Sequence, residues 1–279
     1  MKKISRRSFL AAAGLSVAAL ALTACGGSSA STASSVASPA ASSEAASTSA
    51  AAGELTTVEA GKLTMATNAA FPPYEMTTDA GEFEGIDIET AQAIADKLGL
   101  ELQIDDMDFD AALLSVQQGK ADIVMAGVTV TDERKAVMDF SDSYATGIQS
   151  IIVPEGSDIA SPDDLAGKKI GTQRGTTGYI YCSDDFGDDN VVAYDDGLTA
   201  VQALNNGQVD AVVIDNAPAQ EFIAANPGLK ILDTSYAEED YAIGMAKGSS
   251  LEDAVNAALE ELKADGTLQS IVDKYITAE

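Results

Sequence analysis

The chain has 279 residues, of which 46% are apolar, so it can bury a substantial core and corresponds to roughly two domains. It carries 44 acidic against 16 basic residues, and a net charge of -28 repels phosphate backbones and argues against nucleic-acid binding. The absence of histidine and the presence of only two cysteines exclude imidazole triads, histidine-ligated metals and multi-thiolate zinc sites. We therefore expect neither a metal nor a cofactor.

Residues 1–24 predict a signal peptide for export. Four cations, Lys2, Lys3, Arg6 and Arg7, precede an apolar run over residues 10–22. That run is shorter and richer in alanine than a membrane span requires. The arginine pair resembles a twin-arginine export motif, although such pairs also occur in ordinary signal peptides.

The segment that follows predicts a lipid anchor and a tether. Residues 22–25 (LTAC) resemble a bacterial lipobox, which implies cleavage before Cys25 and a thioether-linked lipid on it; the alternative is an ordinary cleavage site with a cysteine by chance. Residues 28–53 are almost entirely Ala, Ser and Thr, too little apolar surface to offset the entropy of ordering. We expect residues 25–53 to be a flexible leash, so that the protein sits on the outer face of the cytoplasmic membrane.

The remaining residues, about 54–279, predict alternating strands and helices. Residues 62–67 have the composition of a short strand. Two segments follow helical spacing: Ala91, Ile94, Ala95 and Leu98, closed by Gly99, and Leu251, Val255, Ala258, Leu259 and Leu262. Strands interleaved with helices favour an α/β fold with mainly parallel sheets.

Residues 109–127 and 198–215 resemble each other. Each has an amphipathic helix, a glycine, an aspartate three residues later and an apolar strand; the glycines and aspartates are Gly119, Gly207, Asp122 and Asp210. Many α/β units share this pattern, but the matching Gly-x-x-Asp spacing suggests equivalent units in two lobes.

The same alignment indicates where a ligand would bind. Gly127 and Asp215 lie five residues beyond the two aspartates, at the carboxyl ends of the two predicted strands. Ligands of open α/β sheets bind at such ends. Two lobes whose strand ends face each other would therefore form a binding cleft.

Arg134 is a candidate for binding a carboxylate. It is one of only two arginines in residues 54–279, and arginine grips carboxylates through parallel hydrogen bonds. Thr131 is a plausible N-cap, with Asp132 and Glu133 in the first helical turn, which would direct Arg134 to the cleft. The alternative is a surface arginine paired with a neighbouring acid.

Four segments, taken in order, resemble the amino-acid-binding proteins of ABC importers, bacterial solute-binding family 3. They are residues 66–75 (ATNAAFPPYE), 85–89 (GIDIE), 126–135 (AGVTVTDERK) and 137–141 (VMDFS). The resemblance covers about 54–279 and implies two Rossmann-like lobes joined by a two-strand hinge, the type II periplasmic-binding-protein fold. The implied boundaries are 54–144 plus 243–279 for lobe 1, 148–239 for lobe 2, and a hinge near 145–147 and 240–242.

The resemblance also implies a ligand site. The ligand α-carboxylate would contact Arg134 and the backbone N–H groups of Thr129 and Thr177. The α-ammonium would contact Asp215, the Thr129 hydroxyl and the Gly127 carbonyl. Residues at the ligand side chain would be Phe71, Phe109, Asn68, Gln173 and Thr176. From the residues alone, aromatic burial favours a core role for the two phenylalanines, and Asp215 could be a helix N-cap before Pro218.

The function implied is the extracytoplasmic substrate-binding component of an ABC importer for a polar or basic amino acid. We expect a monomer without catalytic activity, whose partners are a free amino acid and the permease subunits. Asn68 is a neutral amide where some binders of basic residues carry an acid, which weakens a purely basic specificity. Two alternatives stay open: a ligand sensor, and an enzyme resembling cyclohexadienyl dehydratases of the same fold.

Overall fold

A computed structural model describes residues 55–276 of the chain. The predicted signal peptide, the lipid attachment at Cys25 and the tether lie outside the described residues. None of the helices formed by residues 55–276 has both the length and the apolar character that a membrane span requires.

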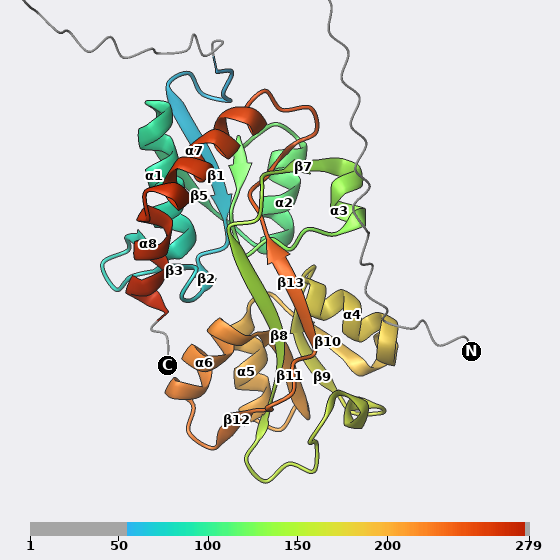
Figure 1. Ribbon diagram of the computed structural model, residues 1–279. Helices are drawn as coiled ribbons and strands as arrows, with labels where there is room; N and C mark the ends of the chain where they lie inside the picture. Colours follow the sequence, from blue (N-terminus) through green and yellow to red (C-terminus); the bar gives the residue numbers. More distant parts are fainter. Residues whose placement is uncertain (1–54, 277–279) are drawn as a thin grey trace, which may run out of the picture. The chain divides into compact units, whose positions relative to one another are not determined.

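The first sheet has the strand order β5-β1-β6-β14-β7 (Figure 1). Its strands are β1 (Lys62–Thr67), β5 (Glu101–Asp106), β6 (Ile123–Val124), β7 (Met138–Phe140) and β14 (Gly244–Ala246). β1 pairs in parallel with β5 and β6, whereas β14 is antiparallel to β6 and β7. The strand predicted over residues 62–67 is therefore the centre of this parallel group.

Helices cover both faces of the first sheet, and β1 is buried on both sides. Leu63 and Met65 pack in one core cluster with α1 (Ile86–Leu98), α7 (Glu252–Ala264) and α8 (Thr267–Tyr275). Ala66 packs in a second cluster with α2 (Phe109–Gln117). The expected helix stop at Gly99 is confirmed, since this residue caps α1 in the left-handed conformation.

The second sheet has the order β10-β9-β11-β8-β12, with β13 also paired to β8. Its strands are β8 (Ala145–Pro154), β9 (Ile170–Gln173), β10 (Val191–Tyr194), β11 (Ala211–Asp215), β12 (Leu229–Ile231) and β13 (Ala237–Tyr241). Its helices are α4 (Thr177–Phe186), α5 (Gly197–Asn205) and α6 (Asn216–Ala225), with 3₁₀ turns at Pro162–Leu165 and Asp188–Asn190. Three short strands, β2 (Ala70–Phe71), β3 (Glu75–Thr77) and β4 (Phe83–Glu84), form a separate antiparallel sheet.

Two long strands connect the sheets. β8 carries the chain from the first sheet into the second, and β13 carries it back toward β14; Figure 1 shows them running side by side between the lobes. They are antiparallel, with Ala145 opposite Tyr241 and Gln149 opposite Ala237. The fold is thus the expected pair of α/β lobes joined by two crossing strands.

The sheets are mixed rather than wholly parallel. In the first sheet only β14 runs against the other four strands, and in the second sheet only β8 runs against the other five. The reason is topological: the chain crosses between the lobes twice, and the strand with which it enters each lobe runs opposite to that lobe's other strands.

The two resembling segments form equivalent units. α2 and β6 in the first lobe correspond to α5 and β11 in the second, and Gly119 and Gly207 both have a positive φ just after their helices, at 65° and 67°. Asp122 accepts hydrogen bonds from the backbone N–H of Thr64 in β1, at 2.8 Å, and of Val58, at 2.7 Å. Asp210 accepts one from Lys169, the residue before β9, at 2.8 Å. In both lobes this aspartate therefore fixes the start of the neighbouring parallel strand.

Candidate ligand-binding site

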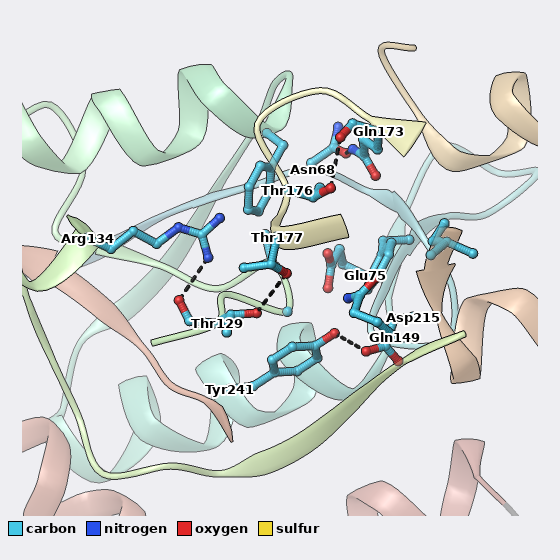
Figure 2. A pocket seen from close by; sticks show the side chains of 15 residues that line it. Asn68, Glu75, Thr129, Arg134, Gln149, Gln173, Thr176, Thr177, Asp215 and Tyr241 are labelled. Atoms are coloured by element: carbon cyan, nitrogen blue, oxygen red, sulfur yellow. Dashed lines mark hydrogen bonds between the residues drawn. The ribbon is translucent and has the colours of Figure 1, made fainter. Parts of the chain in front are cut away.

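A cavity lies where strand ends of the two sheets meet, with about 430 Å³ of space free of protein atoms. All ten residues predicted for the ligand site line it: Asn68, Phe71, Phe109, Gly127, Thr129, Arg134, Gln173, Thr176, Thr177 and Asp215. Figure 2 shows polar side chains from both lobes converging on this space.

The Arg134 guanidinium is positioned by a short helix, α3 (Asp132–Val137). The predicted N-cap is confirmed: the Thr131 hydroxyl accepts a hydrogen bond from the Arg134 backbone N–H at 3.2 Å. Arg134 is only 8% exposed, so it is not the surface arginine of the alternative interpretation. Its Nη1 donates to the Thr129 carbonyl at 2.8 Å and its Nη2 to the Gly175 carbonyl at 3.2 Å.

No described carboxylate forms an ion pair with Arg134 within 4.0 Å, and its guanidinium lies 5.3 Å from the centre of the Phe109 ring. Burial lowers the pKa of Arg134, while the nearby Glu239 raises it. A guanidinium keeps its charge at neutral pH even so. The cavity therefore has a fixed cation with N–H donors to spare.

Asp215 ends β11 and is 2% exposed. Its Oδ1 caps α6 by accepting from the Ala217 N–H at 3.3 Å, and its Oδ2 accepts from the Tyr241 hydroxyl at 2.5 Å. Burial raises the pKa of Asp215 to about 6, against the lowering effect of the Tyr241 hydrogen bond. Asp215 is thus both the helix cap of the alternative interpretation and a carboxylate of the cavity wall.

The two phenylalanines also have both of the roles considered. Phe109 belongs to the core cluster under α2, and half-buried Phe71 packs against the core of the first lobe; both also line the cavity. Gly127 lies between Phe71 and Tyr241 with φ at 54°, where an added Cβ would sit 3.0 Å from the Phe71 ring. A larger residue at this position would close part of the cavity.

A buried glutamate organises the hydroxyl groups of the site. Glu239, in β13, accepts at Oε2 from the hydroxyls of Thr129 at 3.1 Å and Thr177 at 3.0 Å, and from the Gln149 amide at 3.0 Å. Thr177 begins α4, and the Thr176 hydroxyl caps that helix. The N-terminus of α4 consequently lies at the cavity, as an anion site would require.

A direct hydrogen bond joins the lobes at the other end of the cavity. The side-chain amide of Gln173, at the end of β9, donates to the side-chain oxygen Oδ1 of Asn68 at 2.8 Å, and the Asn68 side-chain amide donates to the Met107 backbone carbonyl at 3.0 Å. The Thr176 hydroxyl donates to the Gln173 carbonyl at 2.8 Å. The three residues predicted to lie near a ligand side chain are therefore linked in one network.

Sequence reasoning missed Glu75, Gln149, Tyr241 and Glu239; the first three line the cavity and Glu239 lies behind it. Glu75 is fully buried in β3, and no described N–H or O–H group donates to either of its carboxyl oxygens. Burial and the neighbouring Asp87 raise its pKa well above the usual range. The one sequence signal was position: these residues flank predicted site residues or lie on the hinge strands.

Residues 63–278 match the family model of bacterial extracellular solute-binding proteins, family 3. The chain belongs to this family. It is 33% identical over 276 residues to the "Probable histidine-binding protein" of Neisseria gonorrhoeae, covering 96% of this chain and 95% of that protein.

Solved structures show the same fold. The arginine-, lysine-, histidine-binding protein ArtJ of Geobacillus stearothermophilus is 34% identical, with a TM-score of 0.75 over 78% of this chain and 96% of that one. An ancestral arginine-binding protein bound to glutamine is 42% identical, with a TM-score of 0.75 over 78% and 99%. These relatives of this solute-binding protein are binding proteins that carry the type II fold.

Proposed function

We propose that this solute-binding protein captures a free amino acid with a polar or basic side chain, closes its lobes around it and delivers it to an ABC permease. One observation carries this proposal: a buried guanidinium from the first lobe and a buried carboxylate from the second line the same cavity. A zwitterion is the small ligand that uses both charges at once.

The ligand α-carboxylate would bind the Arg134 donors that do not reach the Thr129 and Gly175 carbonyls, together with backbone N–H groups at Thr129 and Thr177. The α-ammonium would bind Asp215, the Thr129 hydroxyl and the Gly127 carbonyl. Lobe closure would exclude water, which strengthens charge-assisted bonds and makes a missing partner costly.

The lining supports a polar or basic ligand side chain. Asn68, Gln173 and Thr176 supply amide and hydroxyl groups, and Glu75 supplies a buried carboxyl group. The rings of Phe71 and Phe109 would enclose the aliphatic stem, and a ligand cation over a ring gains about 0.5–2 kcal/mol. The amino acids named for the relatives above are histidine, arginine, lysine and glutamine, all of which have polar or basic side chains.

The protein would act as a monomer without catalysis, outside the cytoplasm. In this proposal residues 1–24 direct export, Cys25 is lipidated and residues 25–53 tether the lobes to the membrane. The lobes would comprise 54–144 plus 243–279 and 148–239, hinged near 145–147 and 240–242. The extracellular character of the family supports the location outside the cytoplasm.

The test is a thermal-shift panel of the twenty amino acids, followed by calorimetry with the best ligand. At about 100 times its dissociation constant that ligand should add about 2.7 kcal/mol to the free energy of unfolding.

Arg134→Ala and Asp215→Ala should each weaken binding at least about a hundredfold, on the order of 3–5 kcal/mol for an orphaned buried charge. Arg174→Ala, which removes the exposed arginine paired with Asp195, is the matched control and should bind normally. Unchanged affinity in either of the first two variants would refute the assigned roles.

A further inference from the structure

At the cavity wall, two carboxyl groups are buried close to each other. Glu75, in β3, and Asp87, in the first turn of α1, both have no exposed surface. The Asp87 backbone N–H donates to the carbonyl of Tyr74, the residue before Glu75, at 2.8 Å, and the two carboxyl groups are close enough for each to affect the other's pKa. Glu75 lines the cavity, and Figure 2 shows its carboxyl group among the converging side chains.

The donors around this pair are too few for two carboxylates. Asp87 Oδ2 accepts from the Gly127 N–H at 3.0 Å and from the Tyr144 hydroxyl at 2.8 Å. No described donor reaches Asp87 Oδ1 or either oxygen of Glu75. A hydrogen bond between two carboxyl groups requires that one of them carry a proton, and two like charges in contact cannot both persist in a buried site.

The other titratable groups around the pair do not remove this requirement. The acids and phenols that act on Glu75, Asp87 or their neighbours are Asp106, Tyr74, Tyr144 and, further along the cavity wall, Asp215 and Tyr241. The buried cation of the cavity is Arg134, which is bonded to the Thr129 and Gly175 carbonyls. The neighbouring acids favour a proton on Glu75, whereas the Gly127 N–H and the Tyr144 hydroxyl favour ionised Asp87, so the proton of the pair belongs on Glu75.

We propose that Glu75 and Asp87 share one proton, that Glu75 donates it in a hydrogen bond to a neutral ligand side chain, and that a cationic side chain expels it to solvent. This inference rests on the proposed function. The balance is simple: protonated Glu75 and a ligand cation become ionised Glu75 paired with that cation, and one proton passes to the buffer. Asp87 acts only through Glu75, so it is a positioning residue for specificity.

The titration of both groups agrees with this geometry. Burial raises the pKa of Asp87 to about 6, and burial together with Asp87 raises the pKa of Glu75 well above its usual range. Near neutral pH the pair therefore holds one proton before the ligand binds. Because a cation releases this proton, affinity for a cationic ligand should rise by about tenfold per pH unit above about 6, and affinity for its neutral isostere should not.

The experiment is calorimetry of the full protein with L-arginine and with L-citrulline, its uncharged isostere. Titrations at about pH 7 in phosphate and in Tris, which differ in ionisation enthalpy, count the protons released. We expect about one proton released with arginine and none with citrulline. Asp87→Asn removes the neighbouring acid and supplies an amide donor, but leaves Glu75 buried, so it should bind arginine with fewer protons released than the wild type. Asp106→Asn, the matched control, should retain the release.

Each outcome decides the proposal. Equal proton counts for the two ligands, or the same proton count in Asp87→Asn as in the wild type, would overturn it while leaving the proposed function intact. Binding of another amino acid but of neither probe would overturn it too, because Glu75 would then not meet the ligand side chain. Failure of every amino acid to bind would overturn both. If Asp87→Asn does not fold, the difference between the two ligands in the wild-type protein decides alone.

Discussion

Asp215 is held by neighbours that leave almost no freedom to its carboxylate. Tyr241 donates to one oxygen and the Ala217 N–H to the other, so the side chain is fixed before any ligand arrives. Gly147, on the crossing strand β8, packs against both groups. Preorganisation of this kind reduces the entropy lost on binding.

Gly147→Ala should therefore weaken ligand binding without removing any polar group. An added Cβ would lie 2.6 Å from Asp215 Oδ2 and 2.6 Å from the Tyr241 ring, so one of them must move. We expect at least about a tenfold loss of affinity, equivalent to about 1.4 kcal/mol, by calorimetry. Gly156→Ala is the control, because nothing lies within 4 Å of its Cβ and it should bind normally. Equal affinities in the two variants would show that the packing around Asp215 is unimportant.

At the scale of secondary-structure elements, the sequence predicted one helix–strand unit in each lobe and a cleft at the carboxyl ends of their strands. Gly127 and Asp215, found by counting from two matching aspartates, both line the cavity. The prediction worked because helix spacing, glycine stops and strand ends are local features. They recur in each lobe and need no knowledge of the other lobe.

Glu75 and Glu239 could not be found in this way. Each is an acid in a short strand, and acids in such positions are usually solvated. Their burial depends on contacts with residues far away in the chain: Glu239 lies against Thr129 and Thr177, and Glu75 against Asp87. Local periodicity carries no information about such contacts.

The matching aspartates should differ in their contribution to stability. Asp122 is buried and accepts two backbone N–H groups, so Asp122→Ala would leave them unpaired and cost about 2–4 kcal/mol of unfolding free energy. Exposed Asp210 accepts one, from Lys169, and Asp210→Ala should cost about 0.5–1.5 kcal/mol. Urea unfolding of the two variants provides the measurement. A larger loss of unfolding free energy in Asp210→Ala than in Asp122→Ala would contradict the explanation based on hydrogen bonds.

For the molecule as a whole, buried acids predict an unusual dependence of stability on pH. The pKa of Asp87 and of Asp215 is raised from 3.8 to about 6, and that of Glu75 is also raised, so the folded chain binds more protons than the unfolded chain between these values. The free energy of unfolding should then increase as pH falls from about 7 to about 5. Relief of repulsion from the net charge of -28 acts in the same direction.

Acids whose pKa is lowered by folding make the free energy of unfolding decrease as pH falls, but only at lower pH. They are Glu89, Asp139, Asp164 and Asp265, whose usual values are 4.5 and 3.8. Their stabilisation is complete above these values and is lost below them. Urea midpoints of the ligand-free protein at about pH 7 and pH 5 test the prediction. A lower midpoint at pH 5 would show that the buried carboxyl groups do not control stability in this range.

The most direct test of the account removes one charge from each side of the proposed contact. Calorimetry would compare the best amino acid of the panel with the amine that lacks its α-carboxylate, in the wild-type protein and in Arg134→Ala. If the guanidinium binds the carboxylate, removing the carboxylate should cost at least about a hundredfold in the wild type and less than about tenfold in Arg134→Ala, because the partner is already gone. The same loss in both proteins would contradict the pairing on which the proposed function depends.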